Sequence, residues 1–386
     1  MRLSLLLLIV LAGIGTAAGQ SDEDKAHWQL RGYIKNMQAG LFFNQEGNTT
    51  YLQDNLFHNR LQLDGFLSEH WHVRADLRTR LFYGDLVRQN SNYGDQVDDV
   101  NNDYFDGSVV LFEGRSWVGH SMLDRLYVEY MTGDWEFSLG RQRINWGISN
   151  VWNPNDIFNA FAFTDFDYEE RPGSDVLRVK RYTGFASSVE VVVRMADQLD
   201  ETIMAGLWKI NTGGYDIQFL GGYVQDNWAI GGGWAGSIKT AGFKGEMTLF
   251  VPNETGEEIS FAATLGLDYA FENGWYTNLG YLYNSNGSTT DGVLNLFDFQ
   301  LSAQNLYPYR HALFAQASRP ITPLFSGSMA LIYSPVRVHP LFINPSFTYS
   351  IATNWDLDLV GQLVFNRDNG FTSPLQSAFL RVKYSF

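Results

Sequence analysis

Cysteine is absent from this chain of 386 residues, which excludes a disulfide scaffold, a thiolate nucleophile and a zinc site with Cys ligands. Positive charge is also scarce, since 27 Lys and Arg stand against 42 Asp and Glu, and the formal net charge is −15. Such a chain repels phosphate, and its basic residues form no run, so we expect no nucleic-acid partner. Beyond residue 20, no apolar stretch approaches the length of a transmembrane helix.

Aromatic residues, by contrast, are abundant. The 20 Tyr, 28 Phe and 11 Trp outnumber the 27 Lys and Arg by about two to one. Aromatic side chains are enriched where a membrane protein meets the interface between lipid and water. The composition therefore favours a protein whose aromatic side chains face an environment other than water.

The beginning of the chain has the layout of a secretory signal peptide. Arg2 precedes an apolar run from Leu3 to Ile14, and small residues follow up to Gly19. We expect cleavage after Gly19, so that residues 1–19 are the signal peptide and residues 20–386 form a single domain. The mature chain then either is soluble and secreted or crosses a membrane as strands.

Alternation of apolar and polar residues predicts strands. In residues 71–84, one face carries Val73, Ala75, Leu77, Thr79, Leu81 and Tyr83, and the other carries His72, Arg74, Asp76, Arg78 and Arg80. Residues 377–386 alternate in the same way. A period of two residues with one oily and one charged face indicates strands that separate two different environments.

We find about 18 such segments, or 16 if two of them are loops, which predicts an all-β fold: a transmembrane antiparallel β-barrel. The segments begin near Trp28, Asn55, Trp71, Asp124, Trp135, Asp175, Phe185, Thr202, Tyr215, Trp228, Ala241, Ile259, Trp275, Tyr309, Leu324, Leu341, Trp355 and Leu375. An even number of strands leaves both ends of the chain on the same side of the membrane.

The connections between these segments alternate in length. Short turns with Gly, Asn and Asp alternate with longer polar connections, which include residues 44–54, 85–123 and 147–174. Short turns on one side and long loops on the other are typical of outer-membrane barrels. A Trp follows directly after each of four short turns, at positions 71, 135, 275 and 355, as expected for an aromatic girdle at one interface.

The chain ends on an alternating strand with Tyr384 and Phe386. This ending resembles the C-terminal recognition strand of bacterial outer-membrane proteins. The resemblance implies that Tyr384 and Phe386 form an assembly signal for the barrel assembly machinery.

A second resemblance covers residues 139–179. A strand with the sequence GRQ leads into a loop with WG and NPND, and the matching residues are Gly140, Arg141, Gln142, Trp146, Gly147, Asn153, Pro154 and Asp156. This pattern resembles porin-like outer-membrane barrels that include the alginate-export family. The resemblance implies an 18-stranded channel for hydrophilic solutes, saccharides among them. The acidic aromatic stretch at residues 165–175 departs from it.

The loop after this strand is longer and richer in aromatic residues than a simple connection between two strands, so we expect it to enter or cover the barrel mouth. Its acidic residues are candidates for a constriction or a calcium loop: Asp156, Asp165, Asp167, Glu169 and Glu170. The alternative is that they are solvated acids with Arg partners such as Arg171. Arg141 poses a conflict, because alternation places it on the lipid face with Leu139 unless a bulge at Gly140 or an early exit from the bilayer intervenes.

The predicted loops and the predicted barrel wall differ in the sign of their charge. Residues 85–123 and 147–174 hold 12 acids against three Arg, whereas the inward faces of the first six segments are basic. We predict that the basic residues line the lumen and bind solute: Arg31, Lys35, Arg60, Arg74, Arg78, Arg80, Arg125, Arg178 and Lys180. Opposed charges in a wide lumen are how porins sort solutes. Salt-bridged ladders inside a plugged barrel are the alternative.

These observations together predict a passive, porin-like channel in the bacterial outer membrane for small hydrophilic solutes, anionic or saccharide. Two other classes stay open: a barrel enzyme that hydrolyses lipid or peptide, and a non-conducting structural or adhesin barrel. We expect no catalytic residues, no bound metal and no cofactor. The expected partners are membrane lipid, the assembly machinery and the solute, and the oligomeric state stays open.

Overall fold

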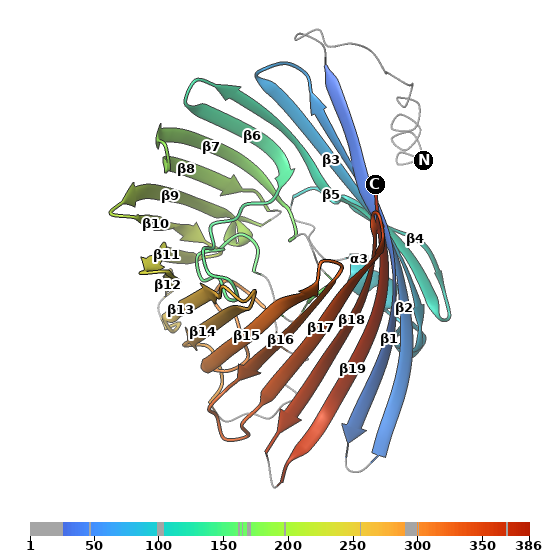
Figure 1. Cartoon of the computed structure of the whole chain (residues 1–386). Helices are drawn as coiled ribbons and strands as arrows, with labels where there is room; N and C mark the ends of the chain where they lie inside the picture. Colours follow the sequence, from blue (N-terminus) through green and yellow to red (C-terminus); the bar gives the residue numbers. More distant parts are fainter. Residues whose placement is uncertain are drawn as a thin grey trace.

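The computed structural model describes residues 26–45, 48–98, 104–160, 163, 165–167, 171–196, 198–254, 256–289, 299, 301–367 and 370–386. The predicted signal peptide, residues 1–19, lies outside them. The described chain forms one antiparallel sheet of 19 strands. Because β1 pairs with both β2 and β19, the sheet closes on itself (Figure 1).

The strands are β1 (His27–Gln45), β2 (Asn48–Phe66), β3 (Trp71–Gly84), β4 (Ser108–Gly114), β5 (Trp117–Thr132), β6 (Trp135–Gln142), β7 (Ser174–Gly184), β8 (Ser187–Arg194), β9 (Ile203–Thr212), β10 (Tyr215–Val224), β11 (Asn227–Ile238), β12 (Ala241–Pro252), β13 (Ser260–Ala270), β14 (Tyr276–Asn284), β15 (His311–Thr322), β16 (Phe325–Tyr333), β17 (Leu341–Ala352), β18 (Trp355–Asn366) and β19 (Thr372–Ser385). In the closed ring, β3 pairs directly with β5, and β4 is an additional strand beside them. The closed barrel therefore has 18 strands. The prediction of an 18-stranded barrel is confirmed, and each of the predicted segments corresponds to one strand of the ring.

The additional strand, β4, lies within the predicted loop 85–123, so that prediction was wrong in part. β5 is paired along one edge with β3, while its other edge is shared by β6 and β4. β6 ends at Gln142, and β4 pairs with the part of β5 that β6 leaves open. The same predicted loop contains two short helices, α2 (Asp85–Gln89) and α3 (Tyr93–Asp98). No helix in the described chain is long and apolar enough to cross a membrane.

The connections largely follow the predicted alternation of short turns and long loops. The four Trp residues that follow short turns are 40–45% exposed on the outside of the barrel, as an interfacial girdle requires. Two connections differ from the prediction. Residues 44–54 are mostly strand, because β1 runs to Gln45 and β2 begins at Asn48, and Gln225 and Asp226 form a tight turn with positive φ on the long-loop side.

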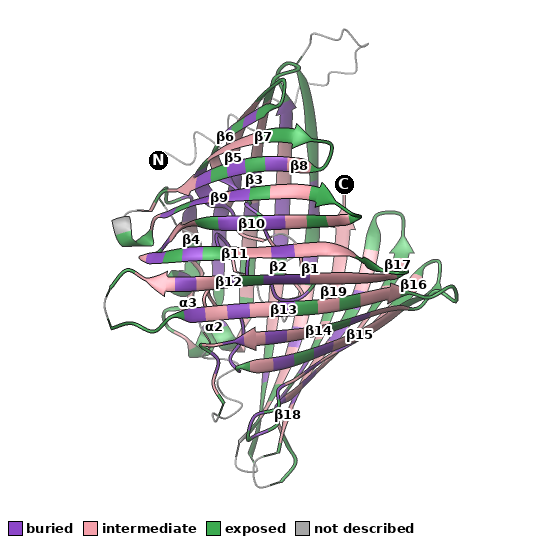
Figure 2. Ribbon diagram, turned by 90° about the vertical axis from the view of Figure 1, so that its left-hand side faces the viewer, coloured by how far each residue is buried: buried purple, intermediate pink, exposed green. Residues whose placement is uncertain are grey.

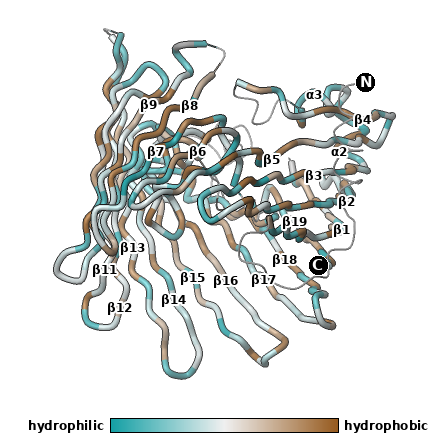
Figure 3. The backbone as a smooth tube through the Cα atoms, turned by 90° about the horizontal axis from the view of Figure 1, so that it is seen from above, coloured by the Kyte–Doolittle hydropathy of each residue, from teal (hydrophilic) through white to brown (hydrophobic). Residues whose placement is uncertain are grey.

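Buried and exposed residues alternate along the strands (Figure 2), and so do polar and apolar residues in the view from above (Figure 3). The exposed members are large apolar side chains such as Trp208, Phe219 and Ile230, which face lipid in a membrane barrel. A β-bulge interrupts this alternation in β5, where Arg125 pairs with Asp76 and Leu123 pairs with Leu77. Asp124 is the extra residue, so Asp124 and Arg125 are both buried.

The seam of the barrel joins the first and last strands. The backbone N–H and C=O of Phe386 each form a 2.9 Å hydrogen bond with Gly32 of β1. The Phe386 ring lies directly over Gly32, where a Cβ would come within 2.8 Å of it. Gly32 therefore provides the space that the terminal aromatic ring occupies.

Candidate functional site

The segment between β6 and β7 folds into the barrel with its described residues, which are 143–160, 163, 165–167 and 171–173 (Figure 1). We call it the inward loop. At its beginning, the Trp146 indole N–H donates to Glu190 Oε1 of β8 at 2.8 Å, and Gln218 of β10 donates to the Trp146 carbonyl at 2.6 Å. Ile144, Trp146 and Phe158 belong to a buried apolar cluster with side chains of β7 to β12. The loop is therefore packed against the wall over this sector.

A single carboxylate then organises the loop. Oε1 of Glu246, on β12, accepts the N–H groups of Ile148 at 3.2 Å and Ser149 at 2.8 Å, and the side-chain amide of Asn153 at 2.9 Å. Oε2 accepts the N–H of Asn155 at 3.1 Å. Glu246 is only 1% exposed. A buried carboxylate is stable only when its oxygens are well satisfied, and four donors from one loop provide this.

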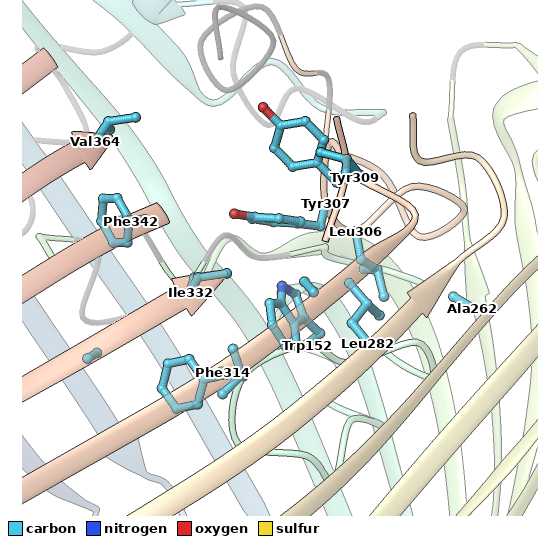
Figure 4. Close-up of a cluster of buried hydrophobic side chains, with 14 of the residues drawn as sticks. Trp152, Ala262, Leu282, Leu306, Tyr307, Tyr309, Phe314, Ile332, Phe342 and Val364 are labelled. Carbon is cyan, nitrogen blue, oxygen red and sulfur yellow. The ribbon is translucent and has the colours of Figure 1, made fainter. Parts of the chain in front are cut away.

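The loop also packs through aromatic residues against the next sector of the barrel, at β14 and β15. Trp152 meets Tyr307 and Phe314 edge-on, with ring centroids 5.7 and 6.3 Å apart (Figure 4). The ring centroids of Phe163 and Phe314 lie 4.9 Å apart. Tyr307 belongs to the connection between β14 and β15, of which Leu306, Tyr307 and Tyr309 are buried in the same cluster. Two loops and the wall thus share an apolar core that fills part of the lumen.

Residues 165–167 reach the seam. Asp167 pairs with Lys35 of β1 at 2.8 Å and with Arg381 of β19 at 3.2 Å. Asp165 is exposed, and the candidates Glu169 and Glu170 lie outside the described residues. The interpretation of this stretch as a calcium loop is not supported by Asp167, because its carboxylate already has two cationic partners. In the described chain, no group of three His, Asp or Glu side chains is arranged to hold a metal ion.

Asp156, the acid of the NPND motif, lies deep inside the loop. Its partner is Arg171, which also donates to Asn153 Oδ1 at 3.0 Å. Burial raises the pKa of Asp156 to about 6, and the Arg171 guanidinium opposes this shift. The motif residues Trp146, Asn153 and Asp156 therefore act as anchors of the inward loop.

The predicted lumen cations fall into two groups. Lys35, Arg60 and Arg78 are buried and ion-paired. Arg60 pairs with Asp76 at 3.0 Å and also with Asp124, which pairs with Arg78 at 3.1 Å. These three buried cations thus pair with acidic groups of the wall and of the inward loop. For these three residues, the arrangement matches the alternative interpretation from the sequence, which was a ladder of salt bridges inside the barrel.

The second group comprises the remaining predicted cations. The Arg31 side chain is 56% exposed and pairs with Asp64. Arg74, Arg80, Arg178 and Lys180 are partly exposed, whereas Arg125 is buried and donates to the carbonyls of Asp124 and Arg171. Arg178 pairs with Glu136 at 2.5 Å and Glu190 at 3.2 Å. Arg31, Arg74 and Arg178 thus each have an acidic neighbour, whereas Arg80 contacts His120 Nδ1 at 3.1 Å. All four side chains keep part of their surface exposed.

A cleft of about 260 Å³ lies at the base of the inward loop. Its lining residues are Arg74, Arg125, Tyr127, Glu129, Gln142, Arg143 and Arg178. Four Arg residues, from β3, β5, β7 and the loop, therefore line one cavity together with the acidic residue Glu129. Two of them also have acidic partners, since Arg74 pairs with Asp76 and Arg178 with Glu136 and Glu190. Arg forks bind carboxylate and phosphate oxygens in pairs, so this cleft has the chemistry of an anion site. Arg143 was missed in the sequence because it belongs to the loop and not to an alternating face.

The predicted conflict at Arg141 is resolved by burial. Arg141 stands opposite Asp175 in the register and binds it through Nε at 2.8 Å and through a second nitrogen at 2.8 Å. It also donates to the Phe105 carbonyl, and Phe105 N–H donates to Asp175 at 2.8 Å. The preceding residue, Gly140, has a φ of 120°. The pair is thus covered by the segment that leads into β4 and does not meet lipid.

A closed antiparallel barrel of 18 strands with a loop folded into its lumen is an architecture of outer-membrane channels. Solved structures of this kind are similar to the chain. OccAB4 of Acinetobacter baumannii has a TM-score of 0.60 at 10% identity, covering 95% of this chain and 99% of that one. OccK9 (OpdG) of Pseudomonas aeruginosa has a TM-score of 0.60 at 12% identity, covering 93% and 98%.

The outer membrane channel DcaP of Acinetobacter baumannii is also similar, with a TM-score of 0.50 at 12% identity over 96% of this chain and 100% of that one. No family profile and no curated protein sequence matches the chain. At these identities the likeness shows the fold, which is the porin-like outer-membrane barrel.

Proposed function

We propose that the protein is a channel of the bacterial outer membrane that lets small hydrophilic solutes pass passively, and that it is not an enzyme. The observation that carries this proposal is the Arg-rich cleft at the base of an inward loop inside a closed 18-stranded barrel. At this strand number the lumen is too wide for wall side chains alone to fill it, so a loop must narrow the passage. The similarity to the outer membrane channel DcaP supports the same function.

The solute preference follows from the cleft. Arg74, Arg125, Arg143 and Arg178 line it, with Glu129 as the acidic lining residue. Acids on loops that stay outside act weakly on a solute in the lumen, because salt screens charges beyond about 8 Å at physiological ionic strength. In the inward loop, Asp156 and Asp167 are paired with cations. Groups at contact distance in a low-dielectric wall act strongly. We therefore propose that the channel prefers anions over cations and over neutral saccharides.

Reversal potential in a KCl gradient across planar bilayers tests this proposal. The wild-type channel should favour Cl⁻, and the double substitution Arg74→Gln with Arg143→Gln should move the potential toward K⁺, more at low salt. Arg88→Gln is the matched control, because Arg88 is exposed on α2 and pairs with Asp85 on the same helix. A wild-type channel that prefers K⁺ would overturn the anion preference. Absence of any conductance would overturn the channel and favour an enzyme or a structural or adhesin barrel.

Three further proposals belong to this function. Membrane lipid and the barrel assembly machinery are the proposed partners, supported by the exposed Trp girdle and by the seating of Phe386 on Gly32. The GRQ, WG and NPND residues support a kinship with the alginate-export family, since Trp146, Asn153 and Asp156 among them anchor the inward loop. Residues 1–19 are proposed to be a signal peptide, which N-terminal sequencing of the membrane-inserted protein would test.

A further inference from the structure

The seam between β1 and β19 carries a concentration of positive charge. Lys35 stands directly opposite Lys383 in the register, and Arg381 lies two residues from Lys383 on β19. Like charges directly opposite each other destabilise a pair of strands. The two strands that close the barrel therefore need an acidic partner on this face. Asp358 of β18 provides one for Arg381, at 2.9 Å.

Asp167 of the inward loop provides another, and it reaches both seam strands. The Lys35 ammonium donates to the Asp167 carboxylate at 2.8 Å and to the Asp167 carbonyl at 2.8 Å. The Lys35 side chain is 0% exposed. Burial of a lysine ammonium is unfavourable unless it is paired and hydrogen-bonded, so the placement of Lys35 depends on Asp167.

The neighbouring residue strengthens the same contact. The Phe166 ring packs on Phe379 of β19, with centroids 4.8 Å apart, and the Arg381 guanidinium lies over Phe166 at 5.8 Å from its centroid. Arg381 also contacts Asp167 at 3.2 Å. Phe166 and Asp167 thus form a two-residue contact that spans the seam.

We propose that Asp167 is a positioning residue that locks the inward loop to the barrel seam. Its docking site is made by the first and the last strand of the ring and exists only after these strands have paired. The loop therefore narrows the lumen only in a closed barrel, and the docked loop in turn stabilises the closure. The effect on conduction rests on the proposed channel function, whereas the effect on the seam does not.

Heat-modifiability on gels and single-channel recording together test the lock. Asp167→Asn should lower the temperature at which the folded form is lost and should increase open, noisy conductance events about tenfold or more, since an uncompensated buried charge remains. Asp165→Asn is the control, because Asp165 lies in the same segment, carries the same charge and is exposed. It should behave like the wild type.

The double variant Lys35→Met with Asp167→Asn completes the cycle. Removal of the buried cation should restore part of the stability lost in Asp167→Asn, including insertion if the single variant fails to fold. Wild-type thermal stability of Asp167→Asn, or a double variant that shows simple additivity, would overturn the lock. If the wild type does not conduct, the channel proposal fails, but the gel measurement still shows whether Asp167 stabilises the seam. The channel proposal and the seam proposal can therefore fail independently.

Discussion

Replacement of Glu246 by Gln should release the inward loop from the wall. The carboxylate accepts three N–H groups on Oε1 and one on Oε2, all from residues 148–155. An amide in its place presents an NH₂ group to at least one of these donors. The side chain keeps its size, so the substitution changes the hydrogen bonding and leaves the packing intact.

The size of the effect follows from the contacts. Hydrogen bonds to a charged group stabilise by about 1.5–3 kcal/mol, neutral ones by about 0.5–1.5 kcal/mol, and an unsatisfied buried N–H costs about 1–3 kcal/mol. Three weakened bonds and one orphaned donor therefore cost about 4–6 kcal/mol, from which the lower desolvation cost of an amide subtracts about 2 kcal/mol. The net loss of about 2–4 kcal/mol shifts the docked population by roughly 30-fold to several hundred-fold.

Single-channel recording should detect this shift as a larger and noisier conductance of Glu246→Gln. Glu254→Gln is the matched control, since Glu254 is exposed in the connection after β12 and undergoes the same change of charge. If Glu246→Gln and Glu254→Gln both show the wild-type conductance and noise, the docked loop does not depend on this carboxylate and the reasoning is refuted.

Deletion of Phe386 should reduce the amount of folded, heat-modifiable barrel in membranes, while inserted molecules conduct normally; undiminished insertion would contradict its role in assembly. The pKa of Asp156 is raised to about 6 in the folded protein, so its protonation stabilises the docked loop, and this stabilisation is lost as pH rises through 6. Recordings should show longer narrow states at pH 5 than at pH 7, and Asp156→Asn should remove that difference. Gly140→Ala should lower the folding yield, because Gly140 has a φ of 120° and a Cβ there would lie 2.2 Å from the Leu126 carbonyl oxygen; a normal yield of heat-modifiable protein would contradict this.

The strands and their order could be predicted from the sequence because the signals are local. Side-chain alternation, tight turns and a Trp after each of four turns depend on residues that are neighbours in the chain. For the same reason, the sequence placed Arg74 and Arg178 on the inward face. The same alternation also places Glu190 and Glu246 on the inward faces of their strands. They were not predicted as site residues because they lie outside the first six segments, whose inward faces are basic.

Only the tertiary structure decided what each inward residue contacts. The bulge at Asp124 brings a carboxylate between Arg60 and Arg78, and this turns predicted solute contacts into buried ion pairs. A bulge depends on the partner strand, so the alternation within β5 does not reveal it. Likewise, β4 forms because β6 ends early and leaves an edge of β5 open.

The inward loop shows the same division most clearly. Its aromatic and acidic composition predicted that it would enter or cover the mouth, but its partners lie on β8, β12, β1 and β19, far apart in the chain. Closure of the ring is what brings Lys35 and Arg381 within reach of one carboxylate. A local sequence pattern specifies which residues are polar, whereas the closed barrel determines which of them remain exposed to a solute, because only long-range pairing decides where opposite charges meet.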